Sequence, residues 1–159
     1  MFRPLIVSAA LISSCVFARA PSAVEIAREN LARSVTALAQ KESECSESAT
    51  ILPAQAISQL GLDEEQLKTA LSYFYLKSSL ECTYPEAANV IVNLRVLHEL
   101  QPDRPEEDGG QLITSNLVDV LRAQAQYEQL PEGVRLQLEG IKALQAPFKM
   151  IESAQALGL

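Results

Sequence analysis

Apolar residues recur at helical spacing through most of the chain after residue 20. In the first such segment they form one stripe with steps of three, four or seven residues: Val24, Leu31, Val35 and Leu38. A further step of seven reaches Cys45. Ser22 and Glu25 stand at the spacing of a helix capping box. We therefore predict a first helix with Cys45 on its core side, ending in the polar run 42–50.

A short helix and a longer one are predicted next. Pro53 is suited to a helix start, and Gly61 can end the short helix. Asp63 can cap the following helix, because Gln66 stands at the capping-box position. We expect this longer helix to run to about Glu81.

A separate helix is predicted after Cys82. Thr83 stands three residues before Glu86, and Pro85 between them is tolerated in a first turn. One side of this helix carries most of its apolar residues: Ala87, Val90, Ile91, Leu94, Leu97 and Leu100. The pattern thus predicts a helical hairpin with its corner at Cys82.

The remaining segments complete an all-α pattern. Residues 101–110 (QPDRPEEDGG) contain no apolar residue and predict a mobile acidic loop. A helix from about residue 112 to 130 follows, with these residues in register: Leu117, Val120, Leu121 and Tyr127. Residues 134–159 are interpreted as one kinked helix or two short ones, interrupted at Pro147. We expect residues 21–159 to form a single-domain bundle of five or six mostly antiparallel helices.

Residues 1–18 have the layout of a secretory signal peptide. Arg3 precedes an apolar run that is too short to span a bilayer, and small residues follow it. Two exits remain open: cleavage near Ala18, or lipoprotein-type processing before Cys15, since the preceding Ile-Ser-Ser resembles a lipobox. We therefore expect no transmembrane helix, and a periplasmic or extracellular protein that is either free or membrane-anchored by a lipid at Cys15.

Cys45 and Cys82 remain as an even pair once the signal segment is removed. In an oxidising compartment such a pair predicts a disulfide. A redox or nucleophilic role lacks support, because the chain has no Cys-x-x-Cys motif and only His98 could serve as a base. We interpret the pair as a structural staple of the bundle.

Charge and motifs exclude several classes of function. The formal net charge is −7, and no basic stripe argues for nucleic acid or an anionic membrane surface. A single histidine cannot supply the ligands of a histidine-based metal site. The neighbouring carboxylates Glu64 and Glu65 do not face each other across a cleft. We expect no catalytic residues, no metal and no cofactor.

Three tyrosines are candidates for partner binding: Tyr73, Tyr75 and Tyr84. Side chains at 73, 74 and 75 cannot share one narrow helix face, because successive residues are about 100° apart. If Phe74 points to the core, at least one neighbouring tyrosine lies on a flank, where tyrosine is common at interfaces. The alternative is a central helix contacted on two sides.

Residues 64–103 also carry "YPEAA" and "ELQP". With these motifs the segment resembles one tetratricopeptide unit, over about 35 residues and without a second copy. Cys82 stands near where such a unit usually has a turn glycine. The resemblance implies a degenerate peptide-binding helical repeat.

The function that the sequence favours is an exported, non-enzymatic helical protein that binds a partner protein in the periplasm, as an inhibitor, immunity protein, adaptor or assembly subunit. This hypothesis rests on the missing catalytic motifs, the expected disulfide, and an acidic surface suited to basic partners. The alternatives are a periplasmic carrier or sensor of an apolar small molecule held between helices, and the tetratricopeptide-like peptide binder.

Overall fold

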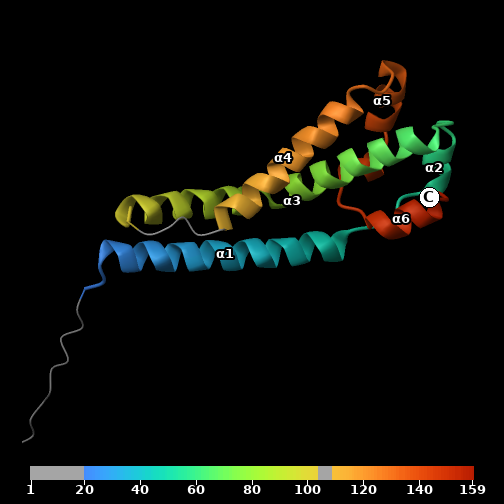
Figure 1. Cartoon of the computed structure of the whole chain (residues 1–159). Helices are drawn as coiled ribbons and strands as arrows, with labels where there is room; N and C mark the ends of the chain where they lie inside the picture. Colours follow the sequence, from blue (N-terminus) through green and yellow to red (C-terminus); the bar gives the residue numbers. More distant parts are fainter. Residues whose placement is uncertain (1–19, 104–108) are drawn as a thin grey trace, which may run out of the picture.

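The computed structural model describes residues 20–103 and 109–159, with residues 109–114 described by their backbone alone (Figure 1). These ranges form α1 (Ala23–Ser48), α2 (Ala54–Ser58), α3 (Glu64–Leu100), α4 (Gly109–Tyr127), α5 (Glu132–Glu139), the 3-10 helix η1 (Lys142–Gln145) and α6 (Met150–Ala156). The all-α prediction is therefore confirmed. Residues 1–18 of the predicted signal segment, with Cys15 and Ala18, lie outside the described residues.

Two regions make up the fold (Figure 1). The arm consists of α1 and the second half of α3, residues 82–100, which lie side by side and antiparallel. The head consists of the first half of α3 with α2, α5, η1 and α6. Helix α4 returns along α3 from the arm toward the head. This arrangement places the middle of α3 at the junction of the two regions.

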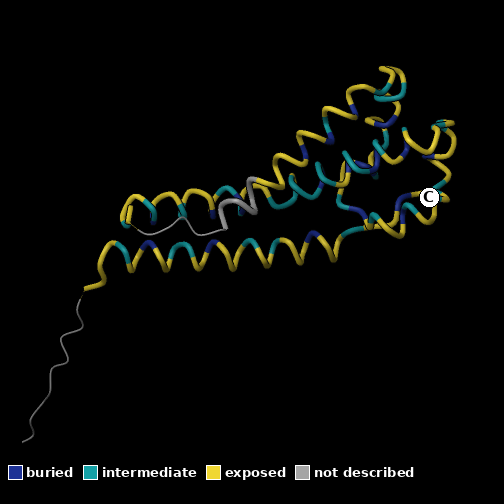
Figure 2. The backbone as a smooth tube through the Cα atoms, in the orientation of Figure 1, coloured by how far each residue is buried: buried dark blue, intermediate teal, exposed yellow. Residues whose placement is uncertain are grey.

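The main hydrophobic core lies in the head (Figure 2). Its centre on α3 is Phe74, whose ring meets the ring of Tyr127 edge-on, with centroids 5.3 Å apart. Tyr73 stacks on Tyr127 at 4.4 Å. The buried members of this core come from α2, α3, the end of α4, α5, η1 and two connecting segments: Leu52, Ile57, Leu67, Ala70, Leu71, Phe74, Tyr127, Leu138, Leu144 and Phe148.

The predicted helix starts are confirmed where they depend on local capping. The Glu25 amide donates to Ser22 Oγ at 3.2 Å, and the Gln66 amide donates to Asp63 Oδ1 at 2.8 Å. Both sites are complete capping boxes. Gly61 has φ +62°, a left-handed conformation that suits glycine at the end of the turn after α2.

The arm is held by a narrow seam along α1. Buried or half-buried residues recur three or four apart, as in a coiled coil: Val24, Ala27, Leu31, Ser34, Leu38, Lys41 and Cys45. The placement of Val35 in this stripe was wrong, because Val35 is exposed and Ser34 is buried instead. The Ser34 hydroxyl donates to the Leu31 carbonyl at 2.8 Å, which satisfies it inside the helix. The polar run 42–50 does not break α1 before Ser48.

The predicted hairpin at Cys82 was wrong, because α3 is one helix of 37 residues with Pro85 inside it. The Thr83 hydroxyl donates back to the carbonyls of Ser79 and Leu80, at 3.1 and 3.4 Å, rather than capping a new helix. The disulfide before Pro85, and the burial of Ala87, Val90 and Leu97 after it, offset the hydrogen bond that proline cannot make. The helix-turn-helix unit implied by the tetratricopeptide resemblance is therefore not formed here.

The C-terminal segment consists of separate short helices that return to the link between α1 and α2. The Thr50 amide donates to the Pro147 carbonyl at 3.3 Å, and the Lys149 amide donates to the Thr50 carbonyl at 2.9 Å. The Leu52 amide donates to Ser153 Oγ at 3.1 Å, and Ser153 is fully buried. These bonds hold the start of α6 beside the end of α1.

Residues 101–110 agree only in part with the predicted loop. Gln101 caps α3, and residues 102–103 form a turn. Residues 104–108 lie outside the described part of the chain. Gly109 and Gly110 belong to α4, so the loop prediction was wrong for them.

Candidate functional site

The disulfide marks the junction between arm and head. Cys45 and Cys82 are bonded, with a Cα–Cα distance of 6.2 Å, so the predicted pairing is confirmed. Cys45 is buried near the end of α1, and Cys82 lies near the middle of α3. A disulfide is compatible with an oxidising compartment. It fixes the end of α1 against the part of α3 where a pocket opens.

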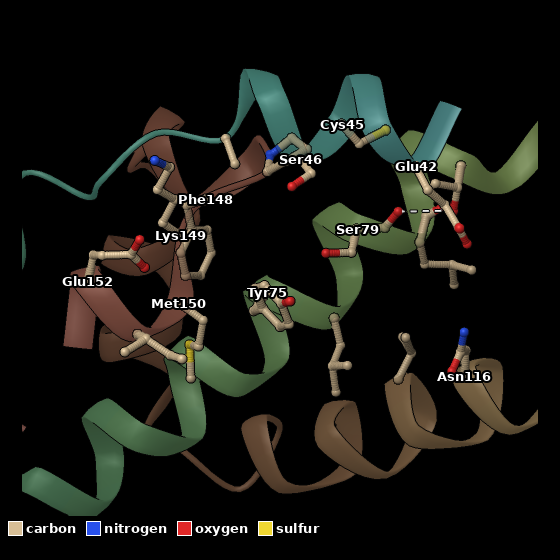
Figure 3. Close-up of a pocket in the computed structure, with 17 residues that line it drawn as sticks. Glu42, Cys45, Ser46, Tyr75, Ser79, Asn116, Phe148, Lys149, Met150 and Glu152 are labelled. Atoms are coloured by element: carbon tan, nitrogen blue, oxygen red, sulfur yellow. Dashed lines mark hydrogen bonds between the residues drawn. The ribbon is translucent and has the colours of Figure 1, made fainter. Parts of the chain in front are cut away.

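A pocket of about 550 Å³ lies beside Cys45, where four parts of the chain meet (Figure 3). The end of α1, the middle of α3, α4 and residues 147–152 all contribute to its walls. Its volume lies within the range of sites that hold small molecules, roughly 300–1,000 Å³. Proteins commonly place such sites between helices of a bundle.

Part of the pocket lining is apolar. Leu76 and Leu80 come from α3, and Val120 comes from α4. Tyr75 and Phe148 contribute aromatic surface, with their rings edge-on and their centroids 5.8 Å apart. Helical spacing places Leu76 and Leu80 one turn apart on one side of α3, so both can line the same cavity.

Charged and polar side chains lie toward two ends of this pocket. Glu42 of α1 and Asn116 of α4 lie toward one end, whereas Lys149 and Glu152 lie toward the other (Figure 3). None of the three charged side chains forms an ion pair with another described residue. Their charges are therefore available to a ligand.

The three candidate tyrosines do not share one surface. Tyr73 is half-buried in the head against Tyr127, and burial raises the pKa of its hydroxyl. Tyr75 lines the pocket. Tyr84 is 59% exposed on the arm. The structure thus places one tyrosine in the core, one in the pocket and one on the outer surface.

Tyr127 is buried, and its hydroxyl forms hydrogen bonds that the sequence did not predict. From the sequence, Tyr127 was predicted only to lie on the apolar side of its helix. Its hydroxyl donates to the Arg135 carbonyl at 3.1 Å and lies 3.4 Å from Glu139 Oε1. Burial raises the pKa of this hydroxyl well above its usual range, and the Glu139 carboxylate raises it further. The bonds link the end of α4 to α5.

A second feature is the apolar surface of the arm. We define the outer face of α3 as Val92, Val96 and Leu100, which are 60%, 45% and 42% exposed. Sequence reasoning was wrong to place Leu100 and Ile91 with the inward residues, because both are exposed. The same holds for Leu117 and Leu121 on α4, whereas Val120 and Tyr127 are buried as predicted.

The other candidate groups are placed on the surface or within helices. His98 is half-buried near the end of α3. Glu64 contacts Lys68 one turn away, and this ion pair lowers the pKa of the Glu64 carboxyl. Among the described residues, no group of three or more His, Cys, Asp or Glu side chains could hold a metal ion. In the same residues, no helix is long and apolar enough to cross a membrane.

The chain was compared with known protein families, curated proteins and solved structures. No protein-family model, curated protein or solved structure matches the chain. The pocket and the outer face of α3 are therefore the two features that carry functional interpretation.

Proposed function

We propose that this chain is an exported, non-enzymatic protein that binds another protein in the periplasm through the outer face of α3. The observation that carries the proposal is the exposure of Val92 and Val96 on the arm. Contiguous exposed apolar side chains commonly mark protein interaction sites. The N-terminal pattern and the disulfide support export.

The second half of α3 is apolar on more sides than α1 covers. Val90 and Leu97 are buried in the arm, and Val92 follows Val90 by two positions, about 200° around the helix. Exposed apolar side chains away from the face that α1 covers are available to a partner. A partner on the outer face would complete this burial.

The spacing of the outer face fits a helical partner. Val92, Val96 and Leu100 follow one another at steps of four residues and so form one ridge of the helix surface. Such ridges pack into the grooves of another helix, most often at a crossing angle of about −50°. The Arg95–Glu99 ion pair lies within this stretch, so the arm has both signs of charge available for orienting a partner.

The test compares two glutamate substitutions on similarly exposed residues. Val92→Glu places a charge on the outer face, whereas Leu136→Glu places one on α5 in the head, where the leucine is 63% exposed. Each tagged protein is used to capture partners from an extract of the source cells. We expect a stoichiometric partner with wild type and Leu136→Glu, and its loss with Val92→Glu.

Sedimentation of the purified protein shows whether that partner is a second copy of the chain. Far-ultraviolet circular dichroism checks that both variants fold. No stoichiometric partner with wild type, or equal capture by both variants, would refute the proposal.

A further inference from the structure

The pocket beside the disulfide has a charge distribution that distinguishes one class of small molecule from others. At one end, Lys149 and Glu152 have opposite charges, so this end of the pocket has no net formal charge. Lys149 is the basic residue that lines the pocket, and it lies at the end away from Glu42 (Figure 3). The residue labelled at the Glu42 end is the neutral Asn116. The pocket therefore has one uncompensated carboxylate.

The end of α1 borders the other end of the pocket, beside Lys149, because the Lys149 amide donates to the Thr50 carbonyl at 2.9 Å. Cys45, Ser46 and Ala49 line the pocket, so the C-terminal end of the helix borders it. The last turn of α1 contains no basic residue. A helix C-terminus carries a partial negative charge, which favours a cation nearby. The partial charge of the helix end therefore acts beside Lys149, whereas an anionic ligand group at the Glu42 end would meet the carboxylate.

The groups near Glu42 suit an ammonium group in particular. An ammonium has three N–H donors and no acceptor. The Glu42 carboxylate and the Asn116 side-chain carbonyl are acceptors. The pocket lining also includes Leu76, Leu80 and Val120, which offer surface only to an apolar body.

We propose that this pocket binds a small amphipathic amine, with its ammonium group at Glu42 and Asn116 and its apolar body along Leu76, Leu80 and Val120. The proposal is independent of the protein-binding function, because the pocket and the outer face of α3 share no residue. The ligand has one cationic head group and an apolar body that fits a volume of about 550 Å³.

The test uses three ten-carbon probes with different head groups: decylamine, 1-decanol and decanoic acid. Near neutral pH the amine is cationic and the acid is anionic. Isothermal titration calorimetry with the disulfide-bonded protein, below the concentration at which the probes aggregate, measures each affinity. We expect decylamine to bind about tenfold more tightly than decanol, because its ammonium makes charge-assisted hydrogen bonds, and decanoate to bind most weakly.

Two glutamine substitutions on α1 locate the site. Glu42→Gln removes the carboxylate in the pocket and should weaken decylamine binding about five- to tenfold while leaving decanol unchanged. Glu47→Gln is the matched control, because Glu47 is exposed on the same helix and does not line the pocket. Val92→Glu should bind decylamine as wild type does, which separates this proposal from the first.

Four outcomes would overturn the amine proposal. These are no measurable binding of any probe, equal affinity for all three, tightest binding of decanoate, or equal effects of Glu42→Gln and Glu47→Gln. Equal affinity for the three probes would show apolar adsorption without selection of the head group.

Discussion

Removal of the Cys45–Cys82 disulfide should lower the free energy of unfolding by about 4 kcal/mol. The two cysteines are 37 residues apart in the sequence. Closing a loop of that length in the unfolded chain costs roughly 13 cal/mol/K of entropy, which corresponds to about 4 kcal/mol near 25 °C. For a chain of this size the change corresponds to a fall of about 10 °C in Tm.

The arm should depend strongly on this bond. The α1 side of its seam contains small or polar residues, among them Ala27, Ser34 and Lys41. These residues bury less apolar area than leucine or isoleucine would, so packing alone holds α1 weakly. Loss of the crosslink should therefore expose α1 to proteolysis before the head unfolds.

The assay is urea unfolding followed by circular dichroism. It compares the oxidised wild type, the reduced wild type and the Cys45→Ala/Cys82→Ala double variant. The reduced wild type keeps both side chains and isolates the effect of the crosslink. We expect both forms without the bond to lose similar stability and to show a larger m-value, because their unfolded chains expose more surface. Two titratable thiols in the native protein, or a loss below about 1 kcal/mol, would refute this reasoning.

Three further predictions concern single residues. Ser153→Ala should cost about 1–3 kcal/mol in urea unfolding, because it leaves the buried Leu52 amide without its acceptor; a neutral effect would contradict that bond. Pro85→Ala should raise Tm and stabilise by about 1–3 kcal/mol, because it restores a backbone donor inside α3; destabilisation would argue against a continuous helix. Stability should fall as pH rises above about 10, because the raised pKa of Tyr127 means that the unfolded chain loses this proton first. Tyr127→Phe should flatten that dependence in urea unfolding between about pH 8 and 11, and an unchanged slope would contradict the assignment.

The candidate site was only partly predictable from the sequence. The disulfide was predicted from two cysteines in a chain expected to be exported, and Cys45 was correctly placed on the core side of the first helix. The pocket was not predicted, because Glu42, Asn116 and Glu152 lie far apart in the sequence. Only the antiparallel packing of α1, α3 and α4, with the return of α6, brings these side chains to one cavity.

The same distinction explains the exposed surface. Periodicity identified the apolar positions of α3 and α4, but it cannot tell which of two apolar sides meets a neighbour. Val90 is buried and Val92 is exposed, although both are valines in the same helix. The position of α1 decides between them.

The sequence by itself determined the features that depend on residues a few positions apart: the capping boxes at Ser22 and Asp63, the turn at Gly61 and the all-α class. Their hydrogen bonds close within three residues, so no distant partner is required. The tertiary structure alone decided that α3 continues through Pro85. The local signal favours a break there, but the Cys45–Cys82 disulfide before Pro85 and the burial of Ala87 and Val90 after it outweigh it.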